Sequence, residues 1–245
     1  MAHYDFYGYG GFPRYVPVGE RRAKALLQAK KLEKRGRVLE PVSLTGKRIA
    51  SSFWGKEWCN NLESYQDFSN RLPRGRTYLR SGAVVDLRLG PGQVDALVAG
   101  GSLYEVSVRI GKLASKRWQT LIKRCAGRID SLVELLRGRL PETVLEALVD
   151  RRSGLFPGPK EIEFTCSCPD YALFCKHIAA VLYGVGARLD KKPDLFFTLR
   201  SVALEDLVAK SALRRAARVE PAVDGRALEG IFGIELDREP RRRRR

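Results

Sequence analysis

Four side chains able to bind a metal ion lie within twelve consecutive positions of this sequence: Cys166, Cys168, Cys175 and His177. The whole chain contains only 5 Cys and 2 His, so this clustering is marked. Zinc prefers four sulfur or nitrogen donors arranged as a tetrahedron. Two ligand pairs, each with one intervening residue, supply such a set and predict a structural zinc site. Four protein ligands leave no open position for a catalytic water.

Two alternatives need no metal. The cysteines could be small buried residues, with His177 an ordinary histidine at a helix start, or Cys166 and Cys175 could form a disulfide. Packing alone gives no reason for the paired spacing, and a disulfide would leave a thiol and an imidazole without a role. The N-terminus does not resemble a secretory signal, and no run of eighteen apolar residues is present. We therefore expect a cytoplasmic protein without a membrane partner, where clustered thiols bind metal more often than they pair.

The elements around the ligands must bring them together. Residues 161–165 alternate between polar and apolar, which predicts a short strand that delivers Cys166. Side chains two apart on a strand share a face, so Cys166 and Cys168 can reach the same ion. Pro169 and Asp170 then favour a turn.

A helix is predicted to follow, because apolar residues recur at helical spacing after Cys175 and Gly186 lies near the expected end. Residues two apart on a helix point in different directions. Cys175 and His177 can therefore converge only if Cys175 precedes the first helical turn. A helix N-terminus also favours the thiolate form of a cysteine.

These residues resemble a SWIM zinc finger, whose signature is Cys-x-Cys, a variable gap and Cys-x-His. The segment C-S-C-P-D…C-K-H-I-A-A-V-L-Y is similar to the bacterial form, and so are the stretches 53–63, 74–87 and 154–162. The resemblance covers roughly residues 50–210. It implies zinc ligation by the four residues above, and a module that binds DNA or protein. It also implies association with Swi/Snf-type helicase-like ATPases, and it supplies no catalytic residues.

The charge of the chain points to a polyanionic partner. Against 28 Asp and Glu stand 45 Lys and Arg, which gives a formal net charge of +17 and a pI near 10.0. Nucleic acid is the commonest such partner, and we expect DNA rather than RNA. The alternative is a solvated cationic surface with no nucleic-acid contact.

Several segments could carry that contact. Residues 20–35 predict a helix whose charges are nearly all positive. A basic tract containing Tyr78 leads into the predicted sheet, either as a lip that contacts nucleic acid or as a solvated loop. The aromatic-rich arm 1–19 could stack on bases or lie across its own domain. The predicted contact residues are Arg74, Arg76, Arg80, Lys176, Arg241, Arg242 and Arg243.

The pattern of the remaining chain predicts an α+β protein. Residues 83–110 form three alternating stretches joined by Gly-rich turns, as in an antiparallel β-meander, and 113–150 show helical spacing. Residues 51–62 predict a buried helix in which Cys59 is a core residue and not a fifth ligand. The predicted divisions are a basic arm and helix (1–50), an α+β core (51–157), the zinc finger (158–190), a C-terminal helical segment (191–237) and a disordered Arg tail (238–245).

Signals for an enzyme are weak. The chain has no P-loop, and with His177 committed to metal only His3 remains for a catalytic triad. A nuclease would need acidic metal ligands, which the sequence does not offer. The predicted function is a non-enzymatic zinc module that binds nucleic acid and assists a helicase-like ATPase. The alternative is a protein-interaction adaptor with no direct nucleic-acid contact.

Overall fold

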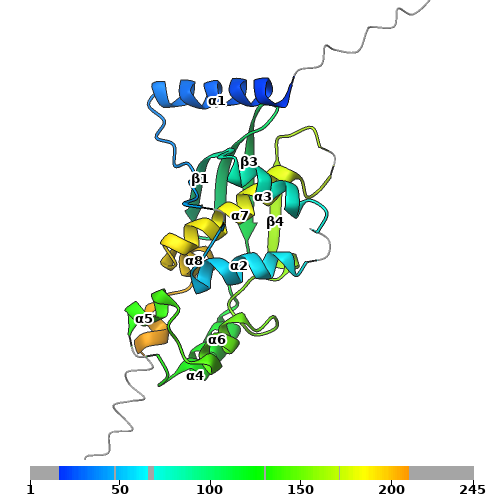
Figure 1. Cartoon of the computed structure of the whole chain (residues 1–245). Helices are drawn as coiled ribbons and strands as arrows, with labels where there is room; N and C mark the ends of the chain where they lie inside the picture. The colour runs from blue at the N-terminus through cyan, green and yellow to red at the C-terminus, as the bar shows by residue number, and fades with distance from the viewer. Residues whose placement is uncertain (1–16, 47, 66–68, 130, 171, 210–245) are drawn as a thin grey trace, which may run out of the picture.

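A computed structural model describes residues 17–46, 48–65, 69–129, 131–170 and 172–209 (Figure 1). The aromatic arm up to residue 16, the tail 238–245 and the predicted contacts Arg241, Arg242 and Arg243 lie outside these residues. Within them, no helix has both the length and the apolar character needed to cross a bilayer.

The protein is α+β, as the sequence predicted, and its centre is one antiparallel sheet in the order β1-β2-β3-β4. The predicted meander is confirmed as β1 (Val84–Gly90), β2 (Gln93–Ala99) and β3 (Leu103–Ile110). The predicted strand before the cysteines is confirmed as β4 (Ile162–Cys166). It pairs with β3, with Cys166 opposite Val106. The zinc-ligand segment is therefore continuous with the main sheet.

One face of the sheet is covered by α7 (Lys176–Lys191), which also packs against α2 (Phe53–Glu63) and α3 (Leu72–Arg80) (Figure 1). Twelve of the sixteen residues of α7 are buried. Most surface helices expose a polar face, whereas a helix that is apolar on nearly all sides belongs to a core. The helix that begins at the zinc ligands is therefore the central helix of the domain.

The opposite face of the sheet is partly covered by the predicted basic helix, α1 (Val18–Lys34). Ala25 and Ala29 of α1 pack against Val85, Leu97 and Ala99. Small residues at this contact let the helix approach the strands closely. The cationic side chains of α1 that the structure describes remain exposed.

The remaining helices lie mainly beyond one end of the sheet (Figure 1). Helical spacing in 113–150 correctly predicted helices there, and Asp194–Leu199 is also helical. Their bounds are α4 (Ser115–Cys125), α5 (Leu132–Arg137), α6 (Glu142–Val149) and α8 (Asp194–Leu199), and a 3₁₀ turn at Pro159–Glu161 precedes β4. The predicted buried helix is confirmed as α2, with Trp54 and Trp58 buried and Cys59 packed against the core.

Two local expectations were wrong. The basic tract before the sheet is neither a lip nor a loop but the helix α3, because Leu72, Gly75 and Leu79 form a buried stripe at helical spacing. The helix after the cysteines does not end near Gly186 but continues to Lys191. A Cβ atom at Gly186 would lie 2.8 Å from Cys59 Sγ, so this glycine permits close packing on α2 and does not mark a helix end.

Candidate metal centre

The first ligand pair sits at the end of strand β4. Cys166 is the last residue of the strand, and the next residue, Ser167, still donates its N–H to the carbonyl of Glu105 at 3.0 Å. The Ser167 hydroxyl accepts a hydrogen bond from the Glu105 N–H at 2.9 Å. These contacts hold the chain extended for one residue beyond the strand, so that Cys166 and Cys168 lie on the same side.

The second pair sits where helix α7 begins. Cys175 is the N-cap residue, with extended backbone angles of φ −95° and ψ 169°, and His177 is the second helical residue. This is the placement required for Cys175 and His177 to converge. The Cys175 Sγ and His177 Nδ1 are 3.7 Å apart, and Cys166 Sγ lies 3.9 Å from the same nitrogen.

The four ligand atoms of Cys166, Cys168, Cys175 and His177 all lie within 4.8 Å of one another. Zinc binds such ligands as a tetrahedron, with Zn–S bonds of about 2.3 Å and a Zn–N bond of about 2.0 Å. The donor atoms of such a site lie about 3.5–3.8 Å from one another. The shortest separations here match that spacing, and no described cysteine is in a disulfide. The residues therefore fit zinc, which would stabilise the junction of β4 and α7.

The cysteines differ in their electrostatics. The hydrogen bond to Cys175, followed by burial, raises the pKa of Cys166. Burial raises the pKa of Cys59 to about 12 and that of Cys125 to about 11, so both stay protonated. A hydrogen bond from the Cys166 thiol, followed in strength by contacts from His177 and nearby backbone N–H groups, lowers the pKa of Cys175 to about 3. Only thiolates bind zinc, so the hydrogen bond from Cys166, together with the N–H groups at the helix start, favours the ligand form of Cys175.

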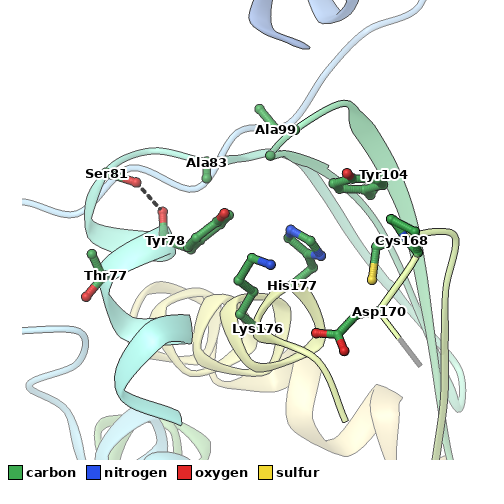
Figure 2. A pocket seen from close by; sticks show the side chains of 13 residues that line it. Thr77, Tyr78, Ser81, Ala83, Ala99, Tyr104, Cys168, Asp170, Lys176 and His177 are labelled. Carbon is green, nitrogen blue, oxygen red and sulfur yellow. Dashed lines mark hydrogen bonds between the residues drawn. The ribbon is translucent and has the colours of Figure 1, made fainter. Parts of the chain in front are cut away.

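His177 is held between two aromatic rings (Figure 2). Its ring centroid lies 4.5 Å from that of Tyr104 on β3 and 5.3 Å from that of Tyr78 on α3. Its Nδ1 faces the thiols, while its buried Nε2 has no hydrogen-bond partner in the described part of the chain. A Cβ atom at Gly100 would lie 2.8 Å from Nε2, so only glycine fits against the ring.

Comparison with known proteins identifies this geometry. Residues 158–185 match the SWIM zinc finger family. These residues form a SWIM zinc finger. Strand β4, its cysteine pair and the start of α7 all fall inside the matched range, and the Cys₃His cluster is its structural zinc site. The SWIM zinc finger is a binding module.

The chain is also similar over most of its length to a mycobacterial protein. It is 35% identical over 179 residues to Rv2102 of Mycobacterium tuberculosis, which is described as uncharacterised. The match covers 72% of this chain and 64% of that protein, so the chain spans less than two thirds of its relative. No solved structure matches the chain.

The predicted nucleic-acid-binding residues near the SWIM finger differ in their exposure and in their contacts. Arg74 and Arg80 are exposed on α3. Arg76 is instead half-buried, with its guanidinium 2.7 Å from Glu63 and its Nε donating to the Tyr183 hydroxyl at 2.8 Å. Lys176 stands beside the zinc ligands, with its Nζ 5.8 Å from the centre of the Tyr78 ring.

Sequence reasoning missed two groups near the SWIM finger. Tyr104 packs against the ring of His177. It lies two and four positions before the buried Val106 and Val108 on β3, and this spacing indicated that it shares their face of the sheet. Arg48 and Lys56 lie in one surface hollow with Arg76 and Arg80. Nothing in their sequence spacing predicts that proximity, because it depends on how α2 packs beside α3.

Proposed function

We propose that this chain is a non-enzymatic module that binds nucleic acid, with DNA favoured over RNA, on a scaffold stabilised by the zinc finger. The observation that carries the proposal is a basic hollow formed by Arg48, Lys56, Arg76 and Arg80 beside α2 and α3. The cations are drawn from three separate segments of the chain. Convergence of positive side chains on one surface is the footprint of a phosphate-binding site.

The charges in the basic hollow are only partly neutralised. Glu63 is the one acidic residue that lines it, and it pairs with Arg76 at 2.7 Å. Arg48, Lys56 and Arg80 are exposed and form no ion pair within the described ranges. Three cations are therefore available to phosphates, while Arg76 fixes the shape of the hollow.

The rest of the described surface agrees with this assignment. Every ion pair found in the described part of the chain uses arginine, and none uses lysine. Exposed lysines on α1 and α4 are consequently free to contact phosphates. They are Lys24, Lys30, Lys31, Lys34, Lys116 and Lys123.

The burial of α7 bears on how such a module would work. A helix that enters the major groove must present an exposed face to the base edges, whereas α7 is enclosed by the sheet, α2 and α3. The SWIM finger would then act through the surface it organises. Phosphate contacts of this kind position nucleic acid without reading its sequence.

A helicase-like ATPase is the proposed protein partner, and a reduced cytoplasmic setting is the proposed location. Both rest on the resemblance of the cysteine and histidine segment to bacterial SWIM proteins. Affinity purification of the tagged chain from its own host tests the partner. Recovery of such an ATPase after nuclease treatment supports it, and its absence from repeated purifications counts against it.

The nucleic-acid proposal is tested by measuring affinity for a random duplex and a random single strand at 50 and 200 mM salt. Three phosphate contacts predict a loss of about 20-fold to 40-fold across that range. Neutralising Arg48, Lys56 and Arg80 together should flatten the salt dependence, whereas Lys192→Ala, which removes an exposed charge outside the hollow, should have little effect. No binding at either salt concentration would instead favour the protein-interaction adaptor.

A further inference from the structure

The zinc centre forms one wall of a second, chemically different pocket. Its volume is about 600 Å³, and it lies between α3, the β2–β3 turn and the start of α7 (Figure 2). This volume is within the range of small-molecule sites, about 300–1,000 Å³. The side chains that give it character are Tyr78, Tyr104, Lys176 and His177. The zinc ligation described above does not use the tyrosines or the lysine.

The pocket presents aromatic surface to a ligand. Tyr78 and Tyr104 come from different elements and flank the His177 ring, and both are half-buried with part of each ring facing the pocket. The Tyr104 ring is tilted by 38° to the imidazole, and Tyr78 meets it edge-on at 74°. Zinc fixes the histidine, and the histidine supports both rings. Rigid aromatic surfaces of this kind bind planar rings by stacking.

The charge in the pocket selects among planar ligands. Lys176 has no ion pair within the described ranges, and Asp170, at the pocket edge, is engaged by Arg71 at 3.7 Å. A free ammonium over an aromatic ring repels a cationic ligand, which argues against trimethyl-lysine and other quaternary amines. It attracts a ligand that carries phosphate. A nucleobase attached to its phosphate satisfies both the rings and the lysine.

Helix α3 links this pocket to the basic hollow. Arg74 and Tyr78 are four residues apart and share one face of α3, while Arg76 and Arg80 share another. Phosphates held along α3 would thus pass close to the aromatic pocket. A base in a duplex is stacked and paired and cannot enter the pocket without leaving the helix. The arrangement suits an unpaired strand.

We infer that the Tyr78–Tyr104 pocket receives one unpaired nucleobase, with Lys176 on the adjoining phosphate. This inference rests on the proposed nucleic-acid function and specifies that the nucleic acid is single-stranded at the pocket. The same chemistry is present in a free mononucleotide and in a single strand. The experiment therefore includes both.

The test uses the zinc-loaded full chain and fluorescently labelled single strands of 20 thymidines or 20 deoxyadenosines. Tyr104→Leu keeps apolar bulk but removes the ring face. We expect it to weaken binding between about fivefold and 150-fold, the range for one stacked base. Tyr104→Phe should retain affinity. Lys176→Gln should weaken binding and lower the salt dependence, while Lys192→Gln should do neither. The affinities of AMP and dTMP are measured directly and by competition with the labelled strands. They test whether the ligand of the pocket is a free nucleotide.

A second set of measurements distinguishes a direct effect on binding from unfolding of the variant. Zinc content is determined for every variant, and the wild-type chain is photocrosslinked to a single strand that carries 5-iodouracil. Crosslinks to peptides containing Tyr78 or Tyr104 support the pocket even if Tyr104→Leu loses zinc. Mononucleotide binding that depends on Tyr104, without strand binding, supports the pocket and assigns it to free nucleotides.

The outcomes distinguish the two proposals. Salt-dependent strand binding that is unchanged by Tyr104→Leu and Lys176→Gln, with crosslinks only elsewhere, overturns the pocket and leaves the proposed function standing. If neither strands nor mononucleotides bind at low salt, both proposals are wrong.

Discussion

The indole N–H of Trp58 on α2 donates a hydrogen bond of 2.8 Å to the carbonyl of Leu182, in the middle of α7. The two residues are 124 positions apart in the chain. Because α7 begins at the zinc ligands, this bond connects the metal centre to the tryptophan-rich part of the core. Loss of zinc should therefore be felt well beyond the finger.

Removal of zinc is expected to unfold the whole core. Metal binding contributes about 10–16 kcal/mol in small zinc modules, and each kcal/mol shifts the melting temperature of a domain of this size by about 2–4 °C. Chelation, or Cys175→Ser, should therefore lower the melting temperature by about 20 °C or more and change the fluorescence of Trp54 and Trp58. Cys59→Ser, outside the ligand set, is the control. An unchanged melting curve in strong chelator would contradict the structural role of the metal.

Acidification should release zinc, because protons compete with the metal for three thiolates and an imidazole. The pKa of Cys175 is lowered, so its thiolate and the stability it contributes are present at neutral pH and are lost as the pH falls toward about 3. A chromogenic zinc indicator, read from pH 8 to pH 4, should show release in the acid range. Retention of zinc at pH 4 would contradict this expectation.

Gly75 allows α3 to pack directly on α7. A Cβ atom there would lie 2.8 Å from the Ala179 carbonyl carbon, which is helix backbone and cannot move aside. Gly75→Ala should destabilise the fold by about 3 kcal/mol, at the upper end of the cost of overpacking. Gly184→Ala is the matched control, because its nearest neighbour is the flexible end of Leu87 at 3.2 Å. Denaturant unfolding measures both, and equal stabilities would contradict the packing argument.

Gly100 leaves space for the zinc-binding histidine. Gly100→Ala would bring a methyl group to 2.8 Å from His177 Nε2 and should tilt the ring. We expect zinc affinity to fall by about tenfold or more, as when the surroundings of a metal ligand are altered. Gly90→Ala, which meets no atom within 4 Å, should leave zinc affinity unchanged. Competition with a chelator of known affinity compares the two.

A buried charge joins the C-terminal side of the fold to the sheet. The Arg200 side chain is 0% exposed and its guanidinium lies 2.7 Å from Glu161, which also pairs with Arg117 at 3.3 Å. Glu161→Gln should cost about 3 kcal/mol, because it leaves a buried cation without its counter-charge. Glu163→Gln, exposed on the neighbouring strand, should cost far less. Equal unfolding free energies for the two variants would contradict this role.

The residue types and local spacing determined the metal site. Cys-x-Cys on a strand and Cys-x-His at a helix start require only nearest-neighbour geometry, so ligands, strand and helix start could all be predicted from the sequence. The three-strand meander followed from the same kind of evidence, because short Gly-rich turns join strands that are adjacent in sequence. Both features depend on interactions between residues that are only a few positions apart in the chain.

Only the tertiary structure decided what surrounds that site. It placed β4 beside β3, made α7 the core helix and turned Gly186 from an expected helix end into a contact with α2. It also brought Tyr78 and Tyr104 to His177, and Arg48 and Lys56 to Arg80. These relationships join residues that are tens of positions apart in the chain. They arise because apolar faces must be buried against one another, and no local pattern specifies which face meets which.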